Sequence, residues 1–254
     1  MGYHVESDIP NYWAYARNFV LQDHMFESIA SWSLPSHLYI VSGWSADCSN
    51  QKDPMSCKSD IVRKRPDRDL ETPFAWTELT YLLKRHGVSW GYYLDGGPQH
   101  FRPTHNGVPR IWNALPWFTD VYEDQQVENV QPLRNFLTAA QTGHLPAVSW
   151  IVPARKDSEH PPERVSTGQR YVTHLINAVM RSPDWDSTAI FLAWDDWGGF
   201  YDHVLPPSVD ELGYGLRVPG LVVVESLIFG AYCARLVGRV EERLREIGEY
   251  NQDS

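Results

Sequence analysis

Two adjacent carboxylates, Asp195 and Asp196, end an apolar run and precede two glycines in the stretch TAIFLAWDDWGGFYDHVLPP. Such a pair is costly to hold without a cation, because each negative charge raises the pKa of the other. A hard divalent metal removes this conflict and prefers oxygen ligands. A simpler interpretation has one aspartate capping the turn and the other solvated. If a metal binds here, we expect Asp202 and His203 to support its ligands.

In the stretch SWSLPSHLYIVSGWS, three serine hydroxyls, at Ser31, Ser33 and Ser36, precede an apolar run, and Pro35 fixes the loop before that run. A serine beside a metal can ionise and attack phosphorus or carbon as a nucleophile. The same serines could instead be turn and capping residues. The stretch therefore offers a candidate nucleophile only if a metal lies nearby.

One histidine is presented by a rigid loop. In PARKDSEHPP, His160 stands between Glu159 and two prolines, which suits a metal ligand or a phosphate contact. A single loop histidine can also be merely exposed. The chain contains no GxSxG elbow, no P-loop and no HExxH motif, so these common hydrolase, nucleotide-binding and zinc-protease signatures do not apply.

The elements that must position these residues alternate between strand-like and helix-like segments. The strand-like runs are densely apolar, as in strands covered on both faces, and span residues 37–43, 88–96, 145–154, 188–196 and 218–226. Helical spacing is found in residues 73–87, 129–143 and 167–183. This alternation predicts an α/β sandwich with a mostly parallel sheet. Ligands of such sheets gather beyond the carboxyl ends of the strands, where Asp195 and Asp196 fall.

Two long segments, residues 44–70 and 97–130, show no sustained periodicity and are rich in Pro, Asp, Ser, Gly and aromatic residues. Segments of this length usually have a function, and we expect them to form walls of a substrate site. Cys48 and Cys57 lie in the first segment and could form a disulfide or remain free thiols.

Composition narrows the possible partners. The 254 residues fit one large domain. The 22 basic and 32 acidic residues give a net charge of −10, which argues against nucleic acid as a partner. No run of 18 apolar residues predicts a membrane-spanning helix, and the N-terminus lacks the pattern of a secretory signal. Cellular location and oligomeric state stay open.

Four motifs in order, spread over roughly residues 10–224, together resemble a bacterial phosphoesterase family that includes non-specific phospholipases C and an acid phosphatase. The motifs are SWSLPSHLYIVSG, LPAVSWIVPARKDSEHPP, TAIFLAWDDWGGFYDHVLPP and GYGLRVPGLVV. The resemblance implies an alkaline-phosphatase-like fold, a three-layer α/β/α sandwich with a mostly parallel central sheet and a metal-dependent site at the strand ends. Members of the family are often secreted or periplasmic.

The resemblance also implies roles for individual residues. Ser33 is the implied nucleophile, because the family's Ser or Thr lies two residues before the Pro of its first motif. Asp195 and Asp196 are the implied ligands of a divalent metal, with Asp196 standing where the family usually has Glu. His160 belongs to the Ser-Glu-His-Pro motif and is expected near the transferred phosphoryl group. The implied reaction hydrolyses a phospholipid or a small phosphate ester through a phosphoseryl intermediate.

The sequence departs from the family's pattern at both ends. The family begins with a Glu-Asn-rich motif that supplies further metal ligands, and this chain starts downstream of it. Residues 227–254 read as a divergent amphipathic helix, so we expect a partial phosphoesterase-like domain over residues 1–226. Two hypotheses follow: a metal-dependent phosphoric ester hydrolase, or an inactive remnant that at most binds a phosphorylated ligand or a protein partner.

Overall fold

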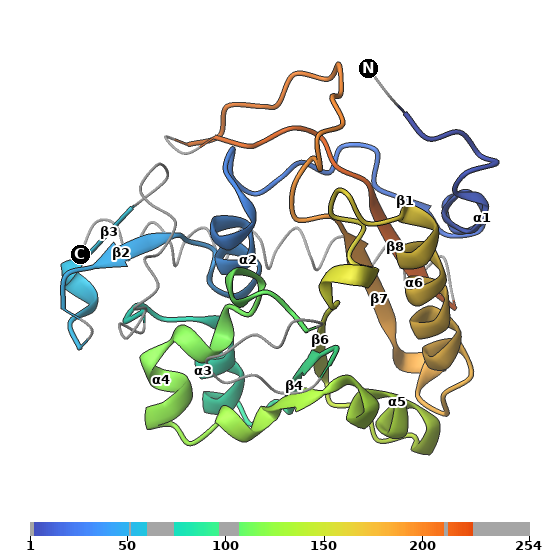
Figure 1. Ribbon diagram of the computed structural model, residues 1–254. Helices are drawn as coiled ribbons and strands as arrows, with labels where there is room; N and C mark the ends of the chain where they lie inside the picture. Colours follow the sequence, from blue (N-terminus) through green and yellow to red (C-terminus); the bar gives the residue numbers. More distant parts are fainter. Residues whose placement is uncertain (1–2, 51, 60–73, 97–106, 211–212, 226–254) are drawn as a thin grey trace.

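The computed structural model describes residues 3–50, 52–59, 74–96, 107–210 and 213–225 (Figure 1). Its α-helices are α1 (Pro10–Asn18), α2 (Ser33–Ser42), α3 (Leu79–Arg85), α4 (Thr119–Glu123), α5 (Leu133–Thr142) and α6 (Val165–Met180). Its strands are β1 (Val20–Leu21), β2 (Ala46–Cys48), β3 (Cys57–Ser59), β4 (Trp90–Leu94), β5 (Val130–Pro132), β6 (Val148–Val152), β7 (Ala189–Ala193) and β8 (Gly220–Val224). The predicted helix at residues 227–254 lies outside the described residues.

The strands form a parallel sheet, an antiparallel sheet and a hairpin. In the parallel sheet the order is β5-β4-β6, with Trp90 opposite Val148. The antiparallel sheet has the order β1-β8-β7, with Ala189 opposite Val224. The predicted α/β class with a parallel sheet is therefore confirmed. Among the described strands the sheet is less uniformly parallel than predicted, because β8 returns beside β7 without a crossover helix in the described part of the connection.

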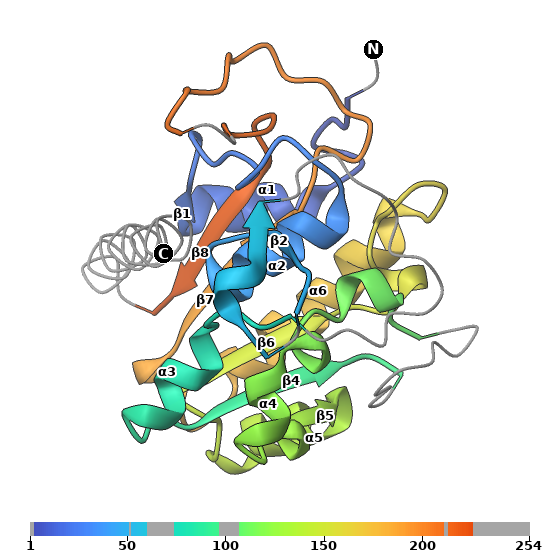
Figure 2. The same ribbon diagram turned by 90° about the vertical axis from the view of Figure 1, so that its left-hand side faces the viewer.

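Helices lie on both faces of the antiparallel sheet. Figures 1 and 2 show α1 and α6 together on one face, and α2 on the other. Contacts between α1 and α6 include a hydrogen bond from the Asn11 backbone N–H to Gln169 Oε1, at 2.9 Å. This arrangement brings the first turn of α2 toward the end of β7, where the paired carboxylates lie.

The prediction of a strand at residues 37–43 is wrong, because this segment belongs to helix α2. Its dense apolar run suggested a strand, but the buried side chains follow helical spacing. Leu34, Leu38 and Val41 are 8%, 2% and 1% exposed, whereas Ile40 is 45% exposed. The helix starts at Ser33, so the candidate nucleophile lies in its first turn rather than in a loop before a strand.

The other predicted elements are confirmed with shifted ends. The four remaining strand-like runs contain β4, β6, β7 and β8. The helix predicted at residues 73–87 is shorter, because Glu78 caps α3 by accepting hydrogen bonds from the Thr80 and Tyr81 backbone N–H groups. The segment 129–143 begins with β5 before α5, and the segment 167–183 contains most of α6.

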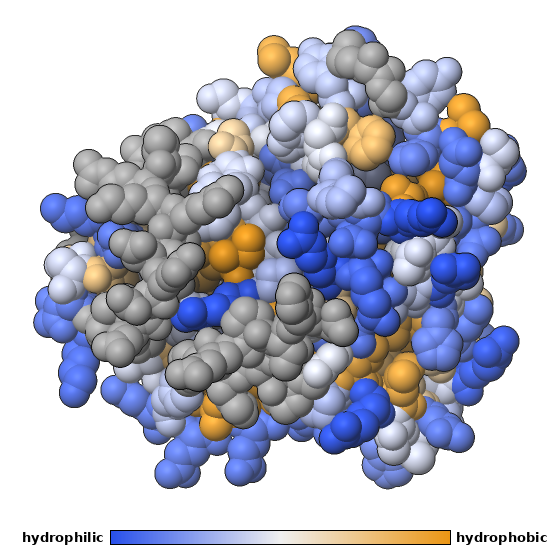
Figure 3. All heavy atoms as spheres, viewed as in Figure 1, coloured by the Kyte–Doolittle hydropathy of each residue, from blue (hydrophilic) through white to orange (hydrophobic). Residues whose placement is uncertain are grey.

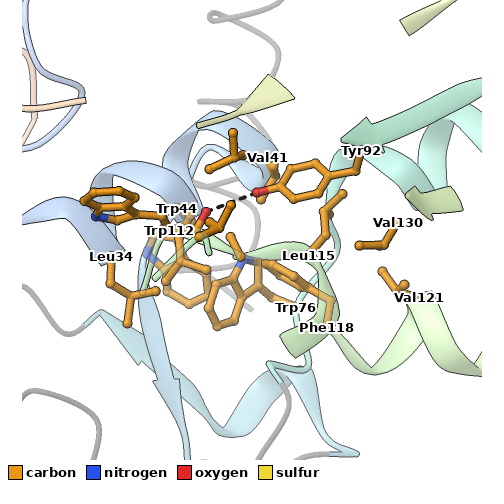
Figure 4. Close-up of a cluster of buried hydrophobic side chains, with 14 of the residues drawn as sticks. Leu34, Val41, Trp44, Trp76, Tyr92, Trp112, Leu115, Phe118, Val121 and Val130 are labelled. Carbon is orange, nitrogen blue, oxygen red and sulfur yellow. Dashed lines mark hydrogen bonds between the residues drawn. The ribbon is translucent and has the colours of Figure 1, made fainter. Parts of the chain in front are cut away.

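The main core lies between α2 and the parallel sheet, and tryptophan dominates it. Figure 4 shows Trp44, Trp76 and Trp112 packed with Tyr92 and Phe118. The Tyr92 hydroxyl donates to the Trp112 carbonyl oxygen at 3.2 Å. Several of these residues come from the described part of the segment 97–130, which forms short helical turns and core instead of a structureless loop.

The segment after α2 forms the β2–β3 hairpin, and a disulfide joins Cys48 and Cys57 across it. Figure 3 shows that the described surface on the face of Figure 1 is mostly hydrophilic. Within the described ranges, no helix has the length and apolar character needed to span a bilayer.

Candidate active site

The structure brings Ser33 into contact with the paired carboxylates. Ser33 is the first residue of α2 and is 5% exposed. Its Oγ donates a hydrogen bond to Asp196 Oδ2 at 3.2 Å, although the two residues are 163 positions apart in the sequence. The N-terminus of a helix favours anions, because its first backbone N–H groups have no partners within the helix. Ser33 therefore lies where an anionic phosphoryl group would be favoured.

A second residue of α2, His37, contacts the other carboxylate. His37 lies four residues after Ser33, so both side chains share one face of the helix. Its Nε2 is 3.3 Å from Asp195 Oδ2. Sequence reasoning missed His37, because the predicted strand began at His37 and left Ser33 in a loop before it. The four-residue spacing from Ser33 is the signal that could have found it.

Asp196 also stabilises the turn that follows β7. Its Oδ1 accepts a hydrogen bond from the Gly198 backbone N–H at 2.8 Å, and Gly198 has a φ of 60°. One oxygen of Asp196 thus caps the turn, as the simpler interpretation of the sequence required, while the other faces Ser33. The capping role and the contact with Ser33 coexist in one side chain.

Asp195 is held as a carboxylate by its neighbours. Burial acts to raise its pKa, but the close approach of His37, together with that of Ser33, outweighs burial and lowers the pKa. Its Oδ2 is buried and, among the described residues, has no partner that meets hydrogen-bond geometry. The ion-pair distance to His37 thus leaves this oxygen able to accept another ligand.

A third carboxylate, Glu27, lies near the pair and was not predicted. Glu27 is 3% exposed, and the backbone N–H groups of Trp197 and Leu216 donate hydrogen bonds to it. Burial raises its pKa to about 7, with further contributions from the charges of Asp196 and Asp195. Its Oε1 has no hydrogen-bond partner in the described part of the chain. No sequence motif marks Glu27, since pairing of its segment with residues 215–217, far along the chain, brings it here.

His160 is linked to this group through Trp112. Its ring centroid is 5.7 Å from that of Trp112, and the His37 ring stacks on Trp112 at 6.5 Å. His160 Nδ1 lies 2.7 Å from the Pro161 carbonyl oxygen. Because a carbonyl oxygen can only accept, Nδ1 carries a proton in this contact, and Nε2 is the nitrogen left for a substrate.

Asp202 and His203 have other partners. Asp202 Oδ2 pairs with Arg217 Nη2 at 3.0 Å, and Oδ1 accepts from the Val204 backbone N–H at 2.8 Å. These hydrogen bonds, first that of Val204 and then that of Arg217, lower the pKa of Asp202. The His203 ring packs edge-on against Tyr201 at 5.2 Å. Their support of a metal site stays a prediction.

The donor atoms at this site have the chemistry that a hard divalent cation requires. Two buried carboxylate oxygens, on Asp195 and Glu27, lack hydrogen-bond partners among the described residues. Oxygen-rich, negatively charged surroundings suit a cation such as Mg²⁺, Ca²⁺ or Mn²⁺. Over the described ranges, no group of three or more His, Cys, Asp or Glu side chains is already arranged to hold a metal. The residues therefore supply the right kind of donor atoms for a metal, but the described part of the chain does not hold a complete set of ligands.

The α/β fold thus places a serine at a helix N-terminus against a carboxylate pair at a strand end, where ligands of such sheets gather. Comparison with known proteins identifies the class of the protein. The model of the Phosphoesterase family matches residues 1–236. The chain belongs to this family.

Curated relatives include three phospholipases C. Phospholipase C B of Mycobacterium tuberculosis is 26% identical over 88% of this chain and 47% of the relative. Hemolytic phospholipase C of Pseudomonas aeruginosa is 30% identical over 84% of this chain and 32% of the relative. Non-specific phospholipase C1 of Arabidopsis thaliana is 26% identical over 78% of this chain and 33% of the relative. The chain thus spans half or less of the length of these proteins.

Proposed function

We propose that this chain hydrolyses phosphate esters, either phospholipid head groups or small phosphomonoesters, through Ser33 and a divalent metal. The observation that carries the proposal is the hydrogen bond from Ser33 Oγ to Asp196 Oδ2, at the N-terminus of α2. It favours an enzyme over an inactive remnant, because a nucleophile and a proton acceptor are already in contact. The names of the relatives support a phospholipid as substrate.

In the proposed reaction, the Ser33 Oγ–H bond points to Asp196, and Oγ attacks the phosphorus atom of the ester. A bond forms between Oγ and phosphorus as the ester P–O bond breaks, and the Ser33 proton passes through Asp196 to the leaving alcohol. Water then attacks the phosphoserine, the Oγ–P bond breaks, one proton of the water returns to Oγ, and the phosphate product departs. His160 Nε2 contacts the phosphoryl oxygens and can exchange a proton with the leaving group or with water.

Asp195 and Asp196 would hold the metal, and Glu27 strengthens the negative potential that attracts it. When bound, a divalent cation neutralises charge on the phosphoryl group and makes the serine hydroxyl easier to ionise. His37 keeps Asp195 oriented, and Asp202 with Arg217 fixes the loop that follows the carboxylates.

We also propose the three-layer, alkaline-phosphatase-like arrangement for the whole fold, with residues 1–226 as one partial domain and residues 227–254 as a separate C-terminal helix. Helices on both faces of the β1-β8-β7 sheet support the layered arrangement. A mostly parallel central sheet would require β6 and β7, which lie in separate sheets here, to be parallel neighbours in one sheet.

The test compares the wild-type chain with Ser33→Ala, using phosphatidylcholine and p-nitrophenyl phosphate as substrates in the presence of Mn²⁺, Ca²⁺ or Zn²⁺. Loss of Oγ should lower the rate by about 10³-fold or more, and a chelator should abolish the wild-type rate. Ser36→Ala is the matched control, because Ser36 is 2% exposed on the same helix. Full activity of Ser33→Ala would disprove the nucleophile, and a wild-type chain without activity or millimolar metal binding would favour the inactive remnant.

A further inference from the structure

Glu159, immediately before His160, is less exposed than His160 and has different partners. Glu159 has a φ of 65°, a left-handed backbone conformation that is uncommon for a residue other than glycine. The turn leaves His160 in an exposed stretch and directs the Glu159 carboxylate into the protein. The proposed reaction assigns Glu159 no task, yet the fold holds its side chain in a specific place.

The Glu159 carboxylate joins three separate elements. Its Oε1 accepts a hydrogen bond from the Tyr12 hydroxyl of α1 at 2.6 Å, and its Oε2 accepts one from Trp194 Nε1 at 3.1 Å. The Tyr12 and Trp194 rings pack edge-on at 5.1 Å, so both donors are themselves fixed. On the third side, a Cβ atom at Gly168 of α6 would overlap the Glu159 side chain. Both carboxylate oxygens therefore accept a hydrogen bond, and Gly168 leaves the space that the Glu159 side chain occupies.

One of these partners is directly connected to the metal-binding candidates. Trp194 is the residue before Asp195, at the end of β7. The hydrogen bond from Trp194 to Glu159 thus ties the backbone next to Asp195 to the backbone next to His160. The connection between the two loops consists of two side chains and one hydrogen bond, so it limits how far His160 can move relative to the carboxylate pair.

We propose that Glu159 is a positioning residue, which holds His160 at a fixed place relative to Asp195 and Asp196 by anchoring its loop to Trp194 and Tyr12. The inference rests on the proposed function, in which His160 contacts the phosphoryl group. It extends that function by giving α1 a part in the site, because Tyr12 supplies one of the two hydrogen bonds. The hydroxyl of Tyr12 acts through Glu159 and does not touch the substrate.

The same loop offers a matched control. Glu163 lies three residues after His160, and its Oε1 forms a surface ion pair with Arg155 Nε at 3.6 Å. Surface pairs of this kind contribute little to stability. Glu163→Gln thus removes a carboxylate from the loop without removing the buried anchor, and it should change neither activity nor the environment of His160.

The test measures kcat and KM for Glu159→Ala, Glu159→Gln and Glu163→Gln, together with the His160 ring signals in NMR spectra. Glu159→Ala should lower kcat about 10- to 100-fold with little change in KM, and it should shift or broaden the His160 signals. Glu159→Gln should stay within about threefold of the wild type, because a glutamine can accept from Trp194 while Tyr12 accepts from its amide. Tyr12→Phe should produce a smaller effect in the same direction and replaces Glu159→Ala if that variant does not fold.

The outcomes separate this inference from the function on which it rests. If His160→Ala keeps full activity, the proposed role of His160 is wrong, whereas the NMR signals still report whether Glu159 positions its ring. If His160→Ala is inactive while Glu159→Ala and Tyr12→Phe leave both kcat and the His160 signals unchanged, the positioning role is overturned. Equal losses in Glu159→Ala and Glu163→Gln would also overturn it, since the effect would then belong to any carboxylate of the loop.

Discussion

At the scale of single residues, His37 and Ser33 each contact one member of the carboxylate pair. His37 contacts Asp195 and Ser33 contacts Asp196, from successive turns of one helix. The imidazole thus contacts one carboxylate while the hydroxyl contacts the other. Without His37, Asp195 would lose the contact that acts most strongly against the effect of burial on its pKa.

We therefore expect His37→Gln to lower kcat/KM about 10- to 100-fold, the usual cost of losing a group that orients a ligand. Initial rates on p-nitrophenyl phosphate and phosphatidylcholine measure the change. His174→Gln, on the exposed side of α6, should leave both rates unaltered. Equal rates for His37→Gln and the wild type would show that Asp195 needs no such partner.

Residue types and local order were enough to predict part of the site. Asp195, Asp196 and Ser33 are recognisable from a double carboxylate at a strand end and a serine before a proline, and the structure brings them together. His37 was hidden by the wrong strand prediction, and Glu27 by distance along the chain. Its approach to the pair depends on backbone hydrogen bonds between Glu27 and residues 215 and 216, which no local pattern reveals.

At the scale of elements, α2 shows why dense apolar runs are ambiguous. The letters LYIV favour a strand by residue type, but burial of Leu34, Leu38 and Val41 against the tryptophan core selects a helix. β4 and β8 have equally dense runs and are strands, because every residue in them is buried. The spacing of the buried residues in the folded chain distinguishes the two cases, and burial cannot be read from one sequence.

The start of α6 provides a prediction at this scale. Gly168 lies against Glu159, and alanine there would push the Glu159 side chain away although alanine favours a helix more than glycine does. We expect Gly168→Ala to lower kcat about tenfold while thermal unfolding shows a folded protein. Ser166→Ala, exposed two residues earlier in α6, is the matched control and should keep the full rate.

A rate for Gly168→Ala equal to that of Ser166→Ala would mean that the Glu159 anchor tolerates displacement. A crystal structure or the His160 NMR signals of Gly168→Ala would then show whether Glu159 had moved.

At the scale of the whole molecule, buried carboxyl groups outside the site govern how stability responds to pH. Burial raises the pKa of Asp120 to about 8 and that of Glu78 to about 7, and the Glu78 charge adds to the effect on Asp120. Their ordinary values are 3.8 and 4.5. At pH values between the ordinary and the raised pKa, these carboxyl groups stay protonated in the folded protein but have lost their protons in the unfolded chain. The free energy of unfolding therefore falls as the pH rises.

We expect urea unfolding to show that these two groups stabilise the protein fully below about pH 4, and that the free energy of unfolding then falls until the pH exceeds about 8. Asp120→Asn should flatten this dependence and stabilise the protein at pH 8, because asparagine has no proton to lose. Asp186→Asn, at an exposed position, should preserve the slope. A slope that Asp120→Asn leaves unchanged would assign the pH dependence to other groups, such as Glu27, whose pKa burial also raises.

The pairing of β1 with β8 has a consequence for how the protein is made. β1 comes early in the chain and β8 is the last described strand, and Arg217 Nη1 donates to the Asp23 carbonyl oxygen across 194 positions. On the ribosome, α2 with Ser33 therefore emerges long before its partners exist, and Glu27 cannot find residues 215 and 216 until β8 is about to leave the exit tunnel. A nascent chain is thus kept from assembling the proposed hydrolytic centre until nearly all of the described fold has been synthesised.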